Sequence, residues 1–220
     1  MDKLFTKDIV KIISIMSDII IENEVYFCEL DSPAGDGDIG MSLSKGFKKV
    51  KNEWETLARD NIGAFLKDCA MIITEHCGGA SGPIWGSAFR SAANYAKGKE
   101  EIDLLELSEM MQSAVDGIQK RGGAKLGDKT LLDALIPAVE SLKSSAAENE
   151  GLFSAMGKSA GAAVLGGEKT KEMVASKGRA TYLGERSLSH PDAGATAIGV
   201  IFTGTVERLG NQLLKVGKGL

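Results

Sequence analysis

The sequence predicts an all-α fold, a closed barrel or bundle of about eight amphipathic helices around a shared core. Apolar residues recur with the helical period along most of the 220 residues. No stretch shows repeated strand-like alternation bounded by turn residues. The chain has 27 Gly, 4 Pro and few aromatic residues (7 Phe, 3 Tyr and 2 Trp), which is unlike a β-sandwich.

Eight segments account for this prediction. In chain order, helices are expected at residues 9–20, 41–56, 62–73, 82–96, 107–118, 132–142, 152–176 and 194–215. Thr6 is a candidate N-cap for the first helix, and Asp103 with Glu106 has capping-box spacing before the fifth. The polar segment 143–150 is expected to be a loop between helices.

Composition and charge bound the class of protein. With 43% hydrophobic and 25% charged residues, the chain is expected to form one globular domain over residues 1–220. The net charge of −4 disfavours a non-specific nucleic-acid binder, which would carry a basic excess. The longest apolar run, residues 69–73, is too short to span a membrane, and residues 1–4 lack the layout of a signal peptide.

The three cysteines are Cys28, Cys69 and Cys77. Their odd number and irregular spacing indicate neither a disulfide framework nor a zinc site. We expect all three to be small buried hydrophobic residues in a cytoplasmic protein.

Glycine-rich junctions interrupt the helices at four places, and the first carries the strongest chemical signal. Residues 30–40, LDSPAGDGDIG, contain Asp31, Asp36 and Asp38 without a basic residue. A hard divalent cation would relieve the repulsion among three carboxylates, whose oxygens it prefers as ligands. An EF-hand is disfavoured because its twelfth position, counted from Asp31, is Ser42 instead of Glu. The alternative to a metal site is an Asx-turn loop with solvated charges.

The second and third junctions give weaker signals. Residues 78–82, GGASG, precede a helix whose N-terminus would suit a phosphate, although a simple glycine-rich cap has the same sequence. Residues 121–130, RGGAKLGDKT, resemble the end of a Walker loop, but Asp128 separates the glycine from the lysine and excludes that motif. Asp128 and Thr130 are instead candidate caps for the next helix.

The fourth junction, residues 178–195, is the longest stretch without a helical pattern, and such loops are usually functional. Arg179 and Arg186 would suit phosphate oxygens, unless both are simply solvated. His190 and His76 are interpreted as structural residues. Clustered carboxylates, a small-residue helix start and loop arginines together predict a site for Mg²⁺ and a nucleoside polyphosphate.

Four stretches in order along residues 30–198 resemble the DhaL family, the nucleotide-binding subunit or domain of dihydroxyacetone kinases. The stretches are LDSPAGDGDIG, GGASGPIWGSAF, GDKTLLDALIP and GRATYLGERSLSHPDAGATAI. The resemblance implies a barrel of eight amphipathic helices with the nucleotide at one end. It also implies that Asp31, Asp36 and Asp38 bind two Mg²⁺ ions that bridge to the diphosphate.

The same resemblance assigns the nucleotide contacts. The phosphates would contact Ile39, Gly40, Met41, Ser42, Ala80 and Ser81. The rest of the nucleotide would contact Gly122, Leu131, Arg179, Asp192, Ala193 and Gly194. Arg179 would also act in catalysis beside the three aspartates. The chain departs from the family pattern at Ile39, where His or Thr is usual, and at Ser42, where Asn is common.

The resemblance also implies partners. In the family, a DhaK subunit holds dihydroxyacetone through a histidine, and DhaL contributes the phosphoryl group from its nucleotide across the interface. A phosphotransferase subunit is therefore implied, with bound ADP recharged by DhaM, a protein of the phosphoenolpyruvate phosphotransferase system. Two alternatives stay open: an ATP-dependent kinase subunit for dihydroxyacetone or another small ketose, and a nucleotide-sensing subunit that docks on a transcriptional regulator.

Some glycines fall inside the expected helices, where Gly costs up to about 1 kcal/mol relative to Ala. The examples are Gly117, Gly161 and Gly199. We expect these three to allow close packing between helices.

Overall fold

The structure, a computed structural model, describes residues 3–217, with side chains described as far as residue 212. Its long helices are α1 (Thr6–Glu22), α2 (Glu24–Asp31), α3 (Ile39–Asn52), α4 (Ile62–His76), α5 (Ser81–Tyr95), α6 (Leu104–Gly122), α7 (Leu132–Ala147), α8 (Leu152–Lys169) and α9 (Ala193–Gly217). Short 3-10 helices are η1 (Trp54–Thr56), η2 (Thr170–Glu172) and η3 (Arg179–Ser187), and two short strands are β1 (Leu4–Phe5) and β2 (Glu101–Ile102).

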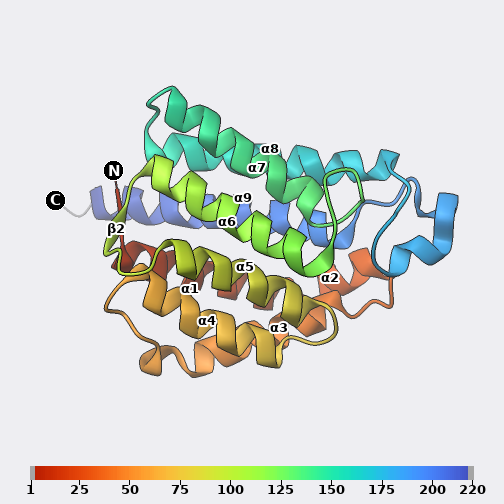
Figure 1. Ribbon diagram of the computed structural model, residues 1–220, viewed down its shortest axis with the longest axis horizontal. Coiled ribbons are helices and arrows are strands. Elements are labelled where there is room, and N and C mark those ends of the chain that lie inside the picture. The colour runs from red at the N-terminus through yellow and green to blue at the C-terminus, as the bar shows by residue number, and fades with distance from the viewer. Residues whose placement is uncertain (1–2, 218–220) are drawn as a thin grey trace.

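Eight helices form a closed ring, which confirms the predicted all-α barrel. From α3 onward each helix packs against the next one in sequence, and α9 returns to α1, which in turn packs against α3. Helix α2 stands apart from this order and packs against α3 and α9. Figure 1 shows the ring side-on, with β2 at one end and η3 projecting at the other.

Because neighbouring helices in the ring run antiparallel, their N-termini alternate between the two ends (Figure 1). Helices α3, α5, α7 and α9 all begin at the end from which η3 projects. The chain reaches the other end where β1 pairs with β2, antiparallel, and Leu4 opposes Ile102. One end of the barrel therefore carries the N-termini of four helices. At the other end, the short antiparallel pair of β1 and β2 holds the start of the chain against residues 101–102.

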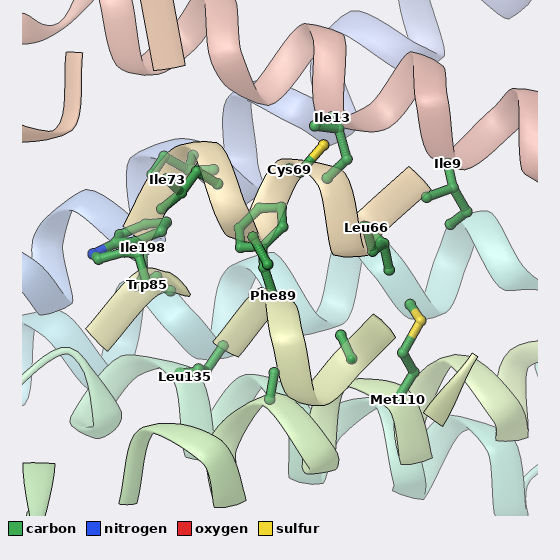
Figure 2. Packing of buried hydrophobic residues seen from close by; sticks show 14 of the residues in the cluster. Ile9, Ile13, Leu66, Cys69, Ile73, Trp85, Phe89, Met110, Leu135 and Ile198 are labelled. Atoms are coloured by element: carbon green, nitrogen blue, oxygen red, sulfur yellow. The ribbon is translucent and has the colours of Figure 1, made fainter. Parts of the chain in front are cut away.

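The apolar faces of the ring helices meet in one core. Figure 2 shows side chains from α1, α4, α5, α6, α7 and α9 pointing into the same interior, among them Phe89 and Leu135. An apolar cavity of ≈ 190 Å³ remains inside the barrel. None of the helices among residues 3–217 has the length and apolarity that crossing a bilayer requires.

The cysteine prediction is confirmed for two of the three thiols. Cys69 and Cys77 are buried, and burial raises the pKa of Cys77 to about 11. Cys28 is only half-buried because it lies on α2, outside the ring. All three are free.

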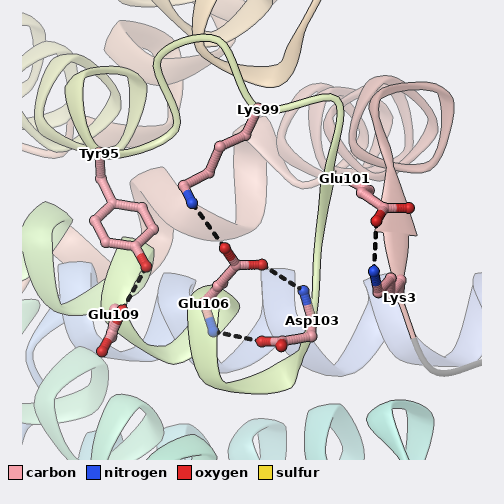
Figure 3. Close-up of polar contacts among 7 residues, drawn as sticks. All are labelled: Lys3, Tyr95, Lys99, Glu101, Asp103, Glu106 and Glu109. Atoms are coloured by element: carbon pink, nitrogen blue, oxygen red, sulfur yellow. Dashed lines mark hydrogen bonds and ion pairs between the residues drawn. The ribbon is translucent and has the colours of Figure 1, made fainter.

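The end of the barrel that carries β2 is fastened by polar contacts, shown in Figure 3. The predicted capping box at the start of α6 is confirmed. The Glu106 N–H donates to Asp103 Oδ1 (2.9 Å), and the Asp103 N–H donates to Glu106 Oε2 (3.0 Å). Lys99 Nζ pairs with the same Glu106 carboxylate at 2.7 Å. Lys3 pairs with Glu101 beside it.

Several predicted boundaries are wrong. Helix α2 and both strands were not predicted, because each is too short to show a period. Helix α7 continues to Ala147, so most of the expected 143–150 loop is helical. Helices α3 and α8 end earlier than expected and pass into 3-10 turns. Thr6 is the first residue of α1 rather than its cap, and the Phe5 N–H donates to Asp8 Oδ2 (2.9 Å) instead.

Candidate functional site

Three aspartates meet between α2 and α3, at the end of the barrel that gathers four helix starts. Asp31 is the last residue of α2, Asp36 lies in the connecting loop, and Asp38 immediately precedes α3. One carboxylate oxygen from each lies within 4.8 Å of the others. The predicted carboxylate cluster therefore exists as a cluster in space.

The glycines of this loop make the convergence possible. A Cβ atom at Gly35 would lie 2.1 Å from Asp31 Oδ1, so a larger residue there would displace that carboxylate from its present position. Gly37 has φ +71°, in the left-handed region that favours glycine, and its N–H donates to Asp31 Oδ2 (2.9 Å). The loop thus folds back onto the end of α2.

The electrostatics of the cluster call for a positive charge. Burial and the neighbouring Asp36 carboxylate raise the pKa of Asp38, while the Arg179 guanidinium acts in the opposite direction. Arg179 forms an ion pair with Asp36. Asp31 lies at the negative end of the α2 dipole, which adds to the repulsion. Three carboxylates in this setting are a donor set that fits a hard divalent cation such as Mg²⁺.

A cavity of ≈ 270 Å³ opens beside the carboxylates. Its wall includes the first residues of α3, α5 and α9 and the residue before α7. The N-cap residues Asp38 and Ala80 make no side-chain hydrogen bond to α3 and α5, the helices that follow them. Uncapped helix starts leave N–H groups and positive dipole ends for an anion. The site therefore offers acidic ligands for a metal and an electropositive wall for phosphate.

Most of the residues predicted for the nucleotide line this cavity. They are Asp31, Asp36, Asp38, Ile39, Ala80, Ser81, Leu131, Arg179, Asp192, Ala193 and Gly194. Four predicted residues do not line it: Gly40, Met41, Ser42 and Gly122. Gly40 is buried where α3 crosses α2, and a Cβ there would lie 2.0 Å from the Glu24 carbonyl oxygen. Met41 is 58% exposed and lies two residues after Ile39, the last residue of α3 in the wall.

Asp192 is held in the cavity wall in front of α9. Burial raises its pKa to about 7, although the Ala195 N–H that donates to its Oδ1 (2.7 Å) acts in the opposite direction. The Asp192 N–H donates to Thr170 Oγ1 (2.8 Å), so the residue is fixed at both ends. A carboxyl group that changes charge near neutral pH therefore faces the cavity.

The third junction builds a turn in which one of the two expected caps forms, that of Thr130. Asp128 does not cap α7, because its carboxylate accepts from the Lys125 N–H (2.9 Å) and from Ser176 Oγ (2.7 Å). These hydrogen bonds lower the pKa of Asp128. Thr130 does serve the helix start, since its Oγ1 accepts from the Leu132 N–H at 3.2 Å.

Two residues of this turn were missed. Asp133 is buried and accepts from the N–H groups of Gly127 (2.6 Å) and Thr130 (2.8 Å), which closes the turn. Lys129 lines the cavity and is buried, with φ 60°. The sequence did contain an indication for Asp133. It lies three residues after Thr130, at the start of an apolar stripe, which is the spacing of an acidic residue that accepts from a backbone N–H at a helix start. The sequence carried no signal for the burial of Lys129.

The fourth junction is less irregular than predicted, because residues 179–187 form η3. Gly178 (φ 69°) precedes η3 and Gly184 (φ 54°) breaks it. Arg179 reaches the carboxylates, whereas Arg186 is not part of the cavity wall. The His190 carbonyl oxygen accepts from Lys129 Nζ, which agrees with a structural role.

Known proteins resemble the chain along most of its length. Residues 33–207 match the family model of the DAK2 domain. The chain is 39% identical over 181 residues to the PEP-dependent dihydroxyacetone kinase, ADP-binding subunit DhaL, of Escherichia coli K12, covering 82% of this chain and 86% of that protein. It is 36% identical over 188 residues to the PTS-dependent dihydroxyacetone kinase, ADP-binding subunit DhaL, of Lactococcus lactis, covering 86% and 90%.

A solved structure shares the fold. The crystal structure of the dihydroxyacetone kinase from C. freundii in complex with AMP-PNP and Mg²⁺ matches with a TM-score of 0.69 at 23% identity. The match covers 91% of this chain and 33% of that enzyme, so the chain spans about a third of the larger protein. At this identity the likeness shows that the helical barrel is the same.

Proposed function

This chain belongs to the DhaL group of the DAK2 domain family, and we propose that it is the ADP-binding subunit of a phosphoenolpyruvate-dependent dihydroxyacetone kinase. The cavity beside the three aspartates carries this proposal, because carboxylates and uncapped helix starts share its wall. Mg²⁺ with a nucleoside diphosphate needs both features in one place. The relatives whose names specify ADP binding match over most of both chains.

In this proposal Asp31, Asp36 and Asp38 hold two Mg²⁺ ions against the diphosphate. The ions supply neutralisation of the phosphate charge, which is their main contribution to phosphoryl transfer. N–H groups at the start of α5, near Ala80 and Ser81, would donate hydrogen bonds to the phosphate oxygens. The protein's own contribution is positioning and exclusion of water rather than a covalent step.

Arg179 has two roles in the proposal. It is paired with Asp36 in the structure and lies in the cavity wall, within reach of a phosphate oxygen once a cation takes over that carboxylate. A guanidinium there would stabilise negative charge on the transferred group. Leu131 and residues 192–194, which also line the cavity, would contact the rest of the nucleotide.

The partners and the phosphoryl donor belong to the proposal as well. A DhaK-type subunit would present dihydroxyacetone at the open end of the cavity, and a DhaM-type protein would recharge the bound ADP. The relatives named PEP-dependent or PTS-dependent support this donor, at 36–39% identity. Phosphoryl transfer would then leave ADP in place between cycles.

The test uses freshly purified full-length protein. Native mass spectrometry is expected to show one ADP retained per chain, and transfer to dihydroxyacetone is expected with a DhaK-type subunit, phosphoenolpyruvate and the phosphotransferase proteins. Turnover with ATP alone would instead indicate an ATP-dependent kinase subunit. Nucleotide binding without transfer under either condition would indicate a nucleotide-sensing subunit. A chain that binds neither ADP nor ATP in the presence of Mg²⁺ would refute the proposal.

A further inference from the structure

Lys129 occupies a location that lysine seldom takes, because its side chain is 2% exposed. None of the ion pairs found among the described residues involves Lys129. The ammonium instead lies within hydrogen-bond distance of four main-chain carbonyl oxygens, those of Thr170 (2.8 Å), Met173 (3.1 Å), Ser187 (2.6 Å) and His190 (2.8 Å). An ammonium has three N–H bonds, so at least one of them is shared between two of these acceptors.

The four acceptors bracket one segment of the chain, residues 174–186. Two of them, at 170 and 173, come just before this segment, and the other two, at 187 and 190, come just after it. The 174–186 segment contains Arg179, the arginine that reaches the carboxylate cluster. Lys129 therefore joins the two ends of the segment at its base.

Neighbouring contacts support the same closure. Asp128 holds the segment through Ser176, whose Oγ donates to Asp128 Oδ1 (2.7 Å). The Ala175 N–H donates to Ser187 Oγ (3.0 Å), which again links the start of the segment to its end. One turn, at residues 128 and 129, thus anchors the 174–186 segment at its base and on its flank.

The arrangement is costly, which indicates that it is specific. Lys129 has φ 60°, a left-handed backbone conformation that long side chains rarely adopt. Burial of the ammonium lowers its pKa, and the nearby Asp192 carboxylate only partly opposes this shift. The charge-assisted hydrogen bonds to these four acceptors offset the costs only while both ends of the segment stay together.

We propose that Lys129 is a positioning residue for the nucleotide site: its ammonium holds both ends of the 174–186 segment and thereby places Arg179 against the carboxylate cluster. The choice of Mg²⁺–ADP as the ligand rests on the proposed function. The closure of the 174–186 segment by Lys129 is independent of that function.

Hydrogen exchange of the full chain without nucleotide tests the closure. Lys129→Met keeps the length of the side chain and removes the donors. The amides of residues 174–186 are expected to exchange about tenfold faster or more in this variant, whereas those of α4 and α5 keep their protection. Lys99→Met, which removes an ion pair at the opposite end of the barrel, is the matched control. Unchanged exchange in residues 174–186, or faster exchange throughout the barrel, would overturn the proposal.

A double-mutant cycle tests the action through Arg179. Calorimetric Kd values for Mg²⁺–ADP are compared for the wild type, Lys129→Met, Arg179→Met and the double variant. Each single change is expected to weaken binding about tenfold to hundredfold. If Lys129 acts by placing Arg179, the double variant binds within about threefold of Arg179→Met alone. Independent, multiplicative losses would contradict this role.

The two experiments separate the two proposals. A wild type that does not bind Mg²⁺–ADP would refute the proposed function, while hydrogen exchange would still decide the closure. The barrel of Lys129→Met is expected to fold, because all four acceptors lie outside the ring helices. Lys129→Gln, which keeps two donors, is the second variant. Failure of both variants to fold would mean that Lys129 holds the whole barrel together, and would contradict a positioning role.

Discussion

At the scale of single residues, the site is a balance between carboxylates that repel one another and the groups that bring them together. Asp31 and Asp38 are positioned by the end of α2 and the start of α3, while Arg179 forms an ion pair with Asp36. One guanidinium cannot offset three negative charges. Because repulsion among the carboxylates remains, binding of a divalent cation to them is favourable.

Removing one carboxylate tests this preference. Asp36→Asn keeps the size of the side chain and is expected to weaken Mg²⁺-dependent ADP binding about a hundredfold, because a metal ligand and its charge are lost. Glu55→Gln is the control, since the Glu55 side chain is 87% exposed on η1. Equilibrium dialysis at several Mg²⁺ concentrations measures both variants. Unchanged affinity in Asp36→Asn would remove Asp36 from the metal site.

Asp192 predicts a pH dependence of stability. Its pKa is about 7 in the folded chain, against 3.8 for the ordinary group. Between these values the folded chain retains a proton that the unfolded chain releases. The free energy of unfolding therefore falls as the pH rises through this window, by up to about 4 kcal/mol, and levels off above it.

Asp192→Asn removes this titration. Urea unfolding of the two proteins without nucleotide, at about pH 4.5 and about pH 7.5, gives the comparison. The variant is expected to gain stability relative to the wild type at the higher pH. An equal difference at both pH values would show that the carboxyl of Asp192 titrates as it does in the unfolded chain.

The residues of the site differ in how far the sequence reveals them. The three aspartates could be predicted because they share one short glycine-rich loop, so their convergence is local. Lys129 could not, because its four acceptors are 41 to 61 positions away in the chain and are all carbonyl oxygens. A lysine in a polar turn has no sequence feature that indicates burial.

At the scale of elements, glycines decide how closely helices approach. The expectation of close packing is confirmed for Gly117, where a Cβ would lie 2.7 Å from the Ser87 carbonyl oxygen of α5, and for Gly199. It is wrong for Gly161, whose Cβ would meet nothing within 4 Å. Gly166, on the same helix α8, would place a Cβ 2.2 Å from the Asp133 carbonyl oxygen of α7.

Helix α8 therefore offers a matched pair of substitutions. Gly166→Ala is expected to lower the free energy of unfolding by about 1–3 kcal/mol, because α8 must move away from α7. Gly161→Ala is expected to raise it by about 0.5–1 kcal/mol, because alanine restricts the unfolded chain at an exposed helical position. Chemical denaturation measures both. The same sign for the two changes would contradict the packing of α8 on α7.

The predictability of the elements follows their length. Long helices with a buried face, such as α4 and α6, show the helical period and were predicted within a few residues. Helix α2 has eight residues and buries only Phe27, so its pattern is too short to detect. Yet α2 carries Asp31, and its end sets the direction from which that carboxylate enters the site.

At the scale of the whole molecule, ring closure creates the nucleotide end. An even number of antiparallel helices brings the starts of α3, α5, α7 and α9 to the same end. Their dipoles add positive potential around the cavity, while the aspartates contribute negative charge at its edge. The amphipathic faces predict a closed barrel, but they do not identify α9 and α1 as the pair that closes it, because that contact joins residues nearly the full chain apart.

Binding at this end is expected to stabilise the entire barrel. With ADP at a hundred times its Kd, the free energy of unfolding rises by about 2.7 kcal/mol, which corresponds to an increase of about 5–10 °C in Tm for a chain of this size. Thermal unfolding followed by circular dichroism, with Mg²⁺ and with a chelator, measures the effect. An equal increase in Tm with Mg²⁺ and with the chelator would show that ADP binds without a metal ion on the carboxylates, and would contradict this prediction.

Isothermal titration of ADP into nucleotide-free protein, with Mg²⁺ and then with a chelator, tests the central claim most directly. The account predicts one ADP per chain in Mg²⁺, and affinity lower by about a hundredfold or more when the metal is removed, because the carboxylates then repel the diphosphate. Saturable binding that is equally tight without Mg²⁺, or no binding in its presence, would contradict the assignment of this end of the barrel to a metal–nucleotide complex.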